Sequence, residues 1–438
     1  MNQIRYNIHL LNLTSLVHDI QMFNSTSNSS SNNVVPEEIY VFLGVYLSVI
    51  CFVGILGNST ALFVFFKHAH LRTRINVFII ALLINDLIMC VFGIPLSAAS
   101  NFYGYFVWDF SVCVFQGFIM YFGSMSSMYI LSAISLSRYI VITRQMSTVV
   151  VNNTVSGMML AFCYILGLFW SGIPFSGWTR YEYEAIGTTC SVALDSADFY
   201  VLSYNICIFV FCYLVPVLTM IFCYCKIIQT IRSTNKNSVW GKHSRILQNK
   251  LKLEKKLMKT VILMIETIDG KNIFHSMAQA VFKVSNSKES SIEPVKIKPG
   301  NERSLTLTED AMSMMNCVLQ VSSLLCCAFL LSWTPYAIVA FWRAFGFGSV
   351  PVIASGIPAI LAKTSAIWNV FIYTFSNTQF RDALYQLIPC QDLRKKMIPS
   401  NDTSESPDKT NQPSGAQRKE LLTCSDDNEC IQLEKVET

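Results

Sequence analysis

Seven long apolar stretches, separated by shorter polar segments, dominate the sequence. Each is long enough to cross a bilayer as a helix, which takes about 20 residues. The stretches cover residues 40–66, 77–98, 113–142, 157–175, 199–228, 316–342 and 352–375. This pattern predicts an all-α membrane protein built as a seven-transmembrane helix bundle. An odd number of spans would place the two termini on opposite sides of the membrane.

Basic residues gather at one side of these spans. They follow or close the first, third, fifth and seventh stretches, at Lys67, Arg72, Arg74, Arg138, Arg144, Lys226, Arg232 and 394–396. Because an excess of Lys and Arg marks cytoplasmic loops, we expect a multi-pass plasma membrane protein with an extracellular N-terminus. Glycosylation sequons at Asn12, Asn24 and Asn28 agree with this orientation. The start of the chain shows no cleavable signal pattern, so the first span is expected to act as the signal anchor.

Three domains follow from the composition. Residues 1–38 form an extracellular glycosylated segment, and residues 39–390 form the membrane domain with a long third cytoplasmic loop or insertion at about 230–315. Residues 391–438 are polar and poor in large apolar side chains, which predicts a disordered cytoplasmic tail with phosphorylation sites. Hydrophobic residues make up 52% of the chain and charged residues only 14%, which argues against an ordinary soluble enzyme.

Cys113 and Cys190 differ from the other cysteines, most of which are scattered through the spans. Both fall at outward-facing positions, one at the start of the third span and one in the loop before the fifth. Because that compartment is oxidising, we predict a disulfide that ties the loop over the bundle. No spacing of Cys and His predicts a metal site. The net charge of +5 lies mostly in the cytoplasmic loops and predicts no nucleic-acid partner.

Lys363 is the one charged residue in the stretch 352–375. A cationic side chain at the bilayer centre costs roughly 2.5 to 3.5 kcal/mol, so such residues are rare and usually functional. About 16 Å of helix separates Lys363 from either end of the stretch, beyond the reach of its stem to the interface. Three explanations for the lysine remain: an ion pair, a place in a water-filled path, or a neutral amine that forms an imine with a carbonyl ligand. The rest of the chain favours the imine.

Short motifs mark the spans: Gly57-Asn58, Asn85-Asp86-Leu87, Ser137-Arg138-Tyr139, Pro216 with Tyr224, Trp333-Thr334-Pro335-Tyr336, and Asn369-Val370-Phe371-Ile372-Tyr373. Taken together, this set resembles the rhodopsin-like G-protein-coupled receptors over nearly the whole chain outside the third loop and the tail. The resemblance implies roles in activation and G-protein coupling for Asp86, Arg138, Tyr139, Tyr224, Asn369 and Tyr373. Asp86 also has a purely structural interpretation, as a carboxyl hydrogen-bonded to Asn58 and to the seventh span.

Residues 362–366, followed by Ile367-Trp368-Asn369, resemble the retinal attachment motif of the opsins within that family. Residues 177–181 resemble the opsin second extracellular loop, and residues 377–381 resemble the segment leading into a short amphipathic eighth helix. The sixth span is most similar to the neuropsin-type non-visual opsins. The resemblance implies that Lys363 carries retinal, 11-cis or all-trans, as a Schiff base. Cys390, just past the eighth helix, suits palmitoylation, although a plain buried cysteine is an equal alternative.

A retinal imine absorbs visible light only when protonated, and a buried cation then needs a carboxylate partner. In vertebrate visual opsins that carboxylate stands at the position of Gln116, which cannot carry the charge. Glu184 falls where many other opsins keep their counterion, and Glu182 is the second candidate. Alternatively, Glu184 is an ordinary solvated acid of the loop. The expected retinal pocket consists of Gln116, Met120, Tyr121, Trp178, Phe209, Trp333 and Tyr336, each of which also suits ordinary core packing. Trp333, one turn from the bend at Pro335, is the residue expected to move on isomerisation.

Two positions depart from the family pattern. Ser137 replaces the acid that pairs with the neighbouring arginine, which predicts a higher basal activity. Val370 replaces a proline of the seventh span, which predicts a straighter helix there.

The sixth span holds the largest anomaly. Residues 253–263 resemble the start of an opsin sixth helix, yet the apolar body resumes only near Leu325. Because joining Leu263 to Leu325 would give an uninterrupted helix, we hypothesise that residues 264–324 are an insertion, such as an unspliced intron. If the insertion is retained, residues 316–325 must supply the cytoplasmic end of the helix, and they lack the expected basic residues. Sequencing the transcript tests this hypothesis.

The sequence therefore predicts a light-sensing receptor, not an enzyme, that binds retinal and activates a heterotrimeric G protein. Arrestin and a receptor kinase would bind the C-terminal tail, and membrane lipid would surround the bundle. A retinal photoisomerase is one alternative, which Ser137 and Val370 keep open. A class A receptor for a diffusible ligand, or a transporter with a functional lysine, is the other, against which the attachment motif argues.

Overall fold

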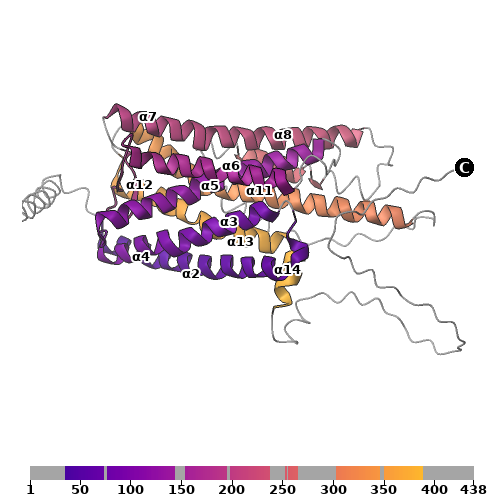
Figure 1. The fold of residues 1–438 in the computed structure, drawn as a ribbon, viewed down its shortest axis with the longest axis horizontal. Helices are drawn as coiled ribbons and strands as arrows, with labels where there is room; N and C mark the ends of the chain where they lie inside the picture. The colour runs from indigo at the N-terminus through magenta and orange to yellow at the C-terminus, as the bar shows by residue number, and fades with distance from the viewer. Residues whose placement is uncertain are drawn as a thin grey trace, which may run out of the picture. The chain divides into compact units, whose positions relative to one another are not determined.

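Long helices lie side by side and form a bundle (Figure 1). The computed structural model describes residues 35–73, 76–143, 153–194, 198–236, 252–253, 255–264, 302–345 and 350–387. Within these ranges, seven helical stretches are long and apolar enough to cross a membrane, so the predicted seven-span fold is confirmed. The chain divides into two units, Met1–Pro389 and Cys390–Thr438. Asn12, Asn24, Asn28, Cys390 and the predicted tail lie outside the described residues.

The spans are continuous helices or helices joined by a local irregularity. The first is α2 (Glu37–Lys67), followed by the 3-10 turn η1 (Ala69–Leu71); the second combines α3 (Asn76–Ile88), a π-helical turn η2 (Met89–Gly93) and α4 (Ile94–Tyr103). The third is α5 (Phe110–Thr143), and the fourth is α6 (Asn153–Gly172) with the 3-10 turn η3 (Ile173–Ser176). The fifth combines α7 (Phe199–Cys207), a π-helical turn η4 (Ile208–Leu214) and α8 (Val215–Lys236). The sixth is α11 (Glu302–Ala344), and the seventh combines α12 (Val352–Lys363) and α13 (Ser365–Ser376).

Polar side chains inside the bundle tie the first, second and seventh spans together. Asn58 donates from Nδ2 to the carbonyl of Ala366 at 3.0 Å, and Asn369 donates to Oδ2 of Asp86 at 2.7 Å. All of these side chains are buried, so each bond is made away from water, where an unpaired polar group is costly. Asp86 therefore has the predicted bond to the seventh span, through Asn369, whereas Asn58 bonds to Ala366 instead.

The third span lies at the centre of the packing, with α6 and α8 along much of its length. Gly167 allows α6 to approach α5 closely, because a Cβ atom at this position would collide with the side chain of Ser126. At one end α5 carries Gln116 against the loop before the fifth span, and at the other end it carries Arg138 against α11.

The short helix α14 (Thr378–Tyr385) runs across the end of the bundle (Figure 1). Asn377 caps it, because its Oδ1 accepts a hydrogen bond from the backbone N–H of Phe380 at 3.1 Å. Phe380 is buried against the rings of Phe65 and Tyr373. This arrangement is the amphipathic eighth helix that the sequence predicts.

The segment predicted as a loop over 230–315 contains more helix than expected. The fifth span continues to Lys236, α11 begins at Glu302, and residues 252–253 and 255–264 are helical as well. The sixth helix runs without a break through residues 316–325, the stretch expected to supply its cytoplasmic end if the insertion is retained. Whether residues 264–324 belong to the mature message stays a prediction about the transcript.

Candidate functional site

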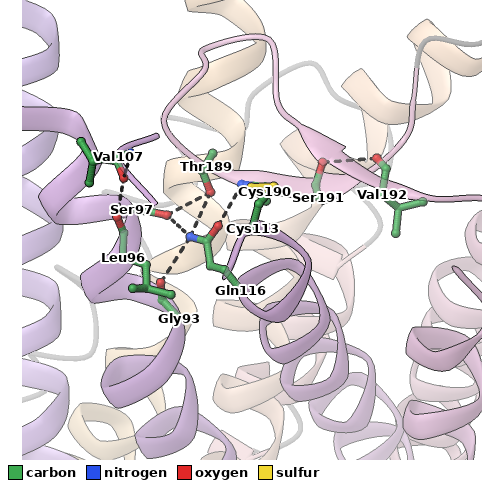
Figure 2. Close-up of a disulfide and its surroundings, with 11 residues drawn as sticks. Gly93, Leu96, Ser97, Val107, Cys113, Gln116, Thr189, Cys190, Ser191 and Val192 are labelled. Carbon is green, nitrogen blue, oxygen red and sulfur yellow. Dashed lines mark hydrogen bonds between the residues drawn. A yellow bond between two sulfur atoms is a disulfide. The ribbon is translucent and has the colours of Figure 1, made fainter. Parts of the chain in front are cut away.

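The extracellular loop before the fifth span is fastened to the third span. The strands β1 (Tyr181–Tyr183) and β2 (Cys190–Val192) pair antiparallel, with Tyr183 opposite Cys190. Cys190 forms a disulfide with Cys113, and their Cα atoms lie 5.4 Å apart (Figure 2). The predicted disulfide is therefore confirmed. It places the loop over one end of the bundle, the end that the sequence predicts to be extracellular.

Gln116 supports the same attachment (Figure 2). Its Oε1 accepts a hydrogen bond from the backbone N–H of Cys190 at 2.9 Å. Its Nε2 donates to the carbonyl of Gly93 at 3.3 Å and to the hydroxyl of Ser97. The amide is fully buried and has partners on the second span and on the loop. Gln116 thus holds the loop in place, a role that the count from Cys113 did not predict.

Replacing Gln116 with alanine is expected to destabilise the protein by about 1 to 3 kcal/mol, since the Cys190 amide loses its buried acceptor. Thermal unfolding of the purified protein in detergent measures the effect as a lower Tm. Gln229, exposed on α8, provides the matched control when it is also changed to alanine. Equal Tm values for the two variants would contradict a pinning role for Gln116.

An apolar cavity with about 720 Å³ of empty space lies among the third, fifth and sixth spans. Four of the predicted pocket residues line it: Tyr121, Phe209, Trp333 and Tyr336. The prediction missed further lining residues on the same face of α11, at 329, 337, 340, 341, 344 and 345. Helical spacing from Trp333 could have identified most of them, because residues three or four apart share a face.

The other three predicted pocket residues lie elsewhere. Met120 packs with the second span, where its side chain would meet any Cβ atom placed at Gly93. Trp178 donates from Nε1 to the hydroxyl of Ser203 at 2.8 Å and packs its ring on Tyr204. Together with Gln116, these residues are absent from the lining of the cavity and support the wall and the loop around it.

Lys363 is the last residue of α12, and Thr364 separates it from the start of α13. The side chain is 7% exposed, and no hydrogen bond or ion pair joins its amine to any described residue. Two positions further on, the hydroxyl of Ser365 accepts a hydrogen bond from Nε1 of Trp333 at 3.1 Å. Lys363 is not itself a lining residue of the cavity, but its turn of helix is bonded to Trp333, which is.

A second, more polar cavity with about 580 Å³ of empty space lies beneath the extracellular loop. Glu184 and Arg343 line it, and Tyr336 lines both this cavity and the apolar one. Glu184 is partly buried and lies close enough to Lys363 to act on it electrostatically. Glu182 lines this cavity too, but it forms an ion pair with Arg180 at 3.1 Å. Of the two counterion candidates, Glu184 is the better placed.

Tyr181 fixes the strand that precedes Glu184. Burial and the neighbouring Tyr121 raise the pKa of the Tyr181 hydroxyl, which therefore stays a neutral donor at physiological pH. It donates to the carbonyl of Ser171 at 2.8 Å. The loop is thus held from the fourth span as well as from the third.

At the opposite end of the bundle, Arg138 is buried and donates from Nε to the hydroxyl of Ser322 on α11 at 3.2 Å. The hydroxyl of Tyr224 lies 4.0 Å from the sulfur of Cys326, also on α11. Ser137 is buried, and its hydroxyl has no hydrogen-bond partner among the described residues. Arg138 and Tyr224 therefore both face the sixth span.

Two other residues of the predicted coupling set point in different directions. Tyr139 packs edge-on against Phe222 of α8, and Tyr373 accepts a hydrogen bond from Asn377 at 2.9 Å. Within the described ranges, no group of three or more His, Cys, Asp or Glu side chains is arranged to hold a metal ion.

A seven-helix bundle with a disulfide-bonded loop and an apolar cavity among its spans is the architecture of a seven-transmembrane receptor. The sequence model of the family described as "7 transmembrane receptor (rhodopsin family)" matches residues 57–373. The chain belongs to this family and, within it, to the opsins.

Its relatives carry opsin names. The chain is 28% identical to "Rhodopsin, GQ-coupled" of Mizuhopecten yessoensis, over 81% of this chain and 61% of that protein. It is 25% identical to "Visual pigment-like receptor peropsin" of Homo sapiens, over 87% and 96% respectively. The crystal structure of squid rhodopsin is similar at a TM-score of 0.64 and 25% identity, covering 86% of this chain and 93% of that one. The chain thus spans about three fifths of the length of the Gq-coupled rhodopsin, and the neuropsin branch stays a prediction.

Proposed function

We propose that this opsin is a light-sensing receptor that binds retinal covalently through Lys363 and activates a heterotrimeric G protein. The observation that carries the proposal is a buried amine without a hydrogen-bond partner among the described residues, two positions before Ser365, which is bonded to Trp333 in the cavity wall. The cavity is lined largely by apolar and aromatic side chains, as small-molecule sites usually are. These residues fit a long apolar aldehyde.

Lys363 would hold retinal as a Schiff base, formed from the amine and the aldehyde with loss of water. When bound, retinal supplies absorption of light and a change of shape on isomerisation. Apolar surroundings would favour the neutral, nucleophilic form of the free amine, because desolvation disfavours the charged form. Tyr121, Trp333 and Tyr336 would confine the polyene, and Trp333 would transmit strain between α11 and α13 through its bond to Ser365.

Glu184 supports the proposal as the carboxylate that would stabilise a positive charge at Lys363. Glu184 lines the polar cavity and is only partly buried, which lowers the cost of its charge. At the cytoplasmic end, Arg138 and Tyr224 contact α11, so movement of that helix would release both side chains. Such a movement would open a cleft for the G protein.

The test is an absorption spectrum of the protein reconstituted with 11-cis and with all-trans retinal, followed by light-dependent nucleotide exchange on purified G proteins. The name of the Mizuhopecten relative makes Gq the first to try. A light-sensitive band together with light-dependent exchange supports the receptor. A band without exchange on any G protein class would favour the photoisomerase, and no band with either isomer would refute a retinal protein.

Changing Glu184 to glutamine is expected to make the visible band disappear at lower pH than in the parent, by about 1 to 3 pH units. The reason is that a nearby carboxylate favours the positive charge on which visible absorption depends. A pH titration of the spectrum in the dark measures the shift. Glu182→Gln is the matched control and should titrate like the parent, because Glu182 is paired with Arg180. A larger shift in the Glu182 variant would reverse the assignment.

A further inference from the structure

The cytoplasmic helix formed by residues 252–264 has one apolar and one basic face, although Glu254 lies outside the described residues. Its buried side chains follow helical spacing, at Leu253, Leu257, Val261 and Met264. Its exposed side chains include Lys252, Lys255, Lys259 and Ile262. Spacing of three or four residues places the apolar group on a single stripe, and a stripe that is almost fully buried must be covered by neighbouring elements. We call these residues the loop helix.

The loop helix is bonded to the cytoplasmic parts of two spans. Arg232 of α8 donates to the sulfur of Met258. Lys256 donates from Nζ to Oε1 of Gln320 on α11, at 3.1 Å. Cys327, about two turns further along α11, donates to the carbonyl of Thr260 at 3.5 Å. The loop helix therefore lies against both α8 and α11.

The part of α11 that it contacts is also the part that meets Arg138 and Tyr224. Ser322 and Cys326, which meet Arg138 and Tyr224, lie between Gln320 and Cys327 on the same two turns of helix. The buried stripe of the loop helix belongs to one continuous apolar cluster with this segment of α11 and with α8. Moving these two turns away from Arg138 would require the loop helix to detach or to move with them.

We propose that the loop helix is an autoinhibitory latch, which holds the cytoplasmic half of α11 against Arg138 until it is released. The loss of the acid at Ser137 leaves Arg138 with a hydroxyl partner on α11 rather than a carboxylate beside it. The latch supplies, through apolar packing on α11, a restraint on the closed state that does not depend on charge. The expected effect of the latch on signalling rests on the proposed function. Its expected effect on the opening of α11 does not.

The direct test is hydrogen exchange, followed by mass spectrometry, on the full-length protein without retinal. A Leu257→Ala/Val261→Ala variant removes the centre of the buried stripe, and Ile262→Ala, on the exposed face of the same helix, is the matched control. The double variant should speed amide exchange in residues 318–327 by about tenfold or more, because local opening becomes easier. Exchange at the rate of the parent, or an equal rise in the control, would overturn the latch.

A milder variant guards against misfolding of the first. Lys256→Ala removes only the bond to Gln320 and leaves the buried stripe intact. It should speed exchange in the same segment by about twofold, in line with a single exposed hydrogen bond. In the dark, both the double variant and Lys256→Ala should raise basal nucleotide exchange on the G protein. Faster amide exchange without higher basal activity would keep the latch and refute the proposed coupling, whereas unchanged amide exchange in both would refute the latch itself.

Discussion

Replacing Lys363 with methionine or alanine is expected to abolish every light-sensitive absorption band of the protein reconstituted with retinal. Lys363 is the only lysine that is buried in the described part of the chain, and a covalent bond to an aldehyde requires a primary amine. Methionine keeps most of the side-chain volume without the amine, so this variant separates the chemistry from a packing defect. The measurement is a difference spectrum, before and after illumination, for each variant with each isomer.

Lys67→Ala is the matched control, since Lys67 is an exposed lysine at the end of α2. It should keep the full band. Thermal unfolding without retinal shows whether the Lys363 variants are folded, and they are expected to be at least as stable as the parent because an unpaired buried amine has been removed. A light-sensitive band that survives in a folded Lys363→Met protein would place the chromophore elsewhere and refute the proposed attachment.

How much of this site follows from the sequence depends on what each residue requires of its surroundings. Lys363 is identifiable because a cation is costly in an apolar span, and Cys113 and Cys190 because both fall on the oxidising side. The chemistry of such residues can be recognised from the sequence, whichever way their helix is rotated. The spans themselves follow from the same logic, as long apolar stretches have few alternatives to a membrane helix.

The lining of the cavity does not follow in this way. Met120 and Tyr121 are neighbours in sequence, yet successive residues of a helix point about 100° apart, and only Tyr121 faces the cavity. The rotation of α5 that decides between them is set by packing with other spans, which no local pattern contains. Gln116 illustrates the same limit, because its partners come from a distant span and from the loop.

The loop helix shows a further limit. Both the sequence of the loop helix and its amphipathic stripe resemble the start of an opsin sixth helix. In the structure, however, α11 forms the whole sixth span, and the loop helix packs beside it. Two segments with suitable apolar faces compete for one position. Because both segments have the same apolar periodicity, the sequence pattern cannot decide between them. The relative stability of the two packing arrangements decides which segment forms the sixth span.

Replacing either Cys113 or Cys190 with serine is expected to have the largest effect on stability. The two cysteines are 77 positions apart, and by chain entropy alone, closing a loop of that size stabilises the folded state by about 4 to 5 kcal/mol. The expected result is a marked drop in Tm and in the yield of folded protein. Cys225→Ser is the control, because Cys225 is a free cysteine on α8. A Tm equal to that of the control would show that the loop is held without the disulfide.

The double variant Cys113→Ser/Cys190→Ser should be no less stable than either single variant, since each substitution alone already removes the bond. Adding Gln116→Ala to it distinguishes two ways of holding the loop. If the disulfide positions the Cys190 amide against Gln116, loss of the disulfide also weakens that hydrogen bond, and the alanine change costs less than it does in the parent. Strictly additive effects would instead mean that the amide network of Gln116 fixes the loop over the cavity independently of the disulfide.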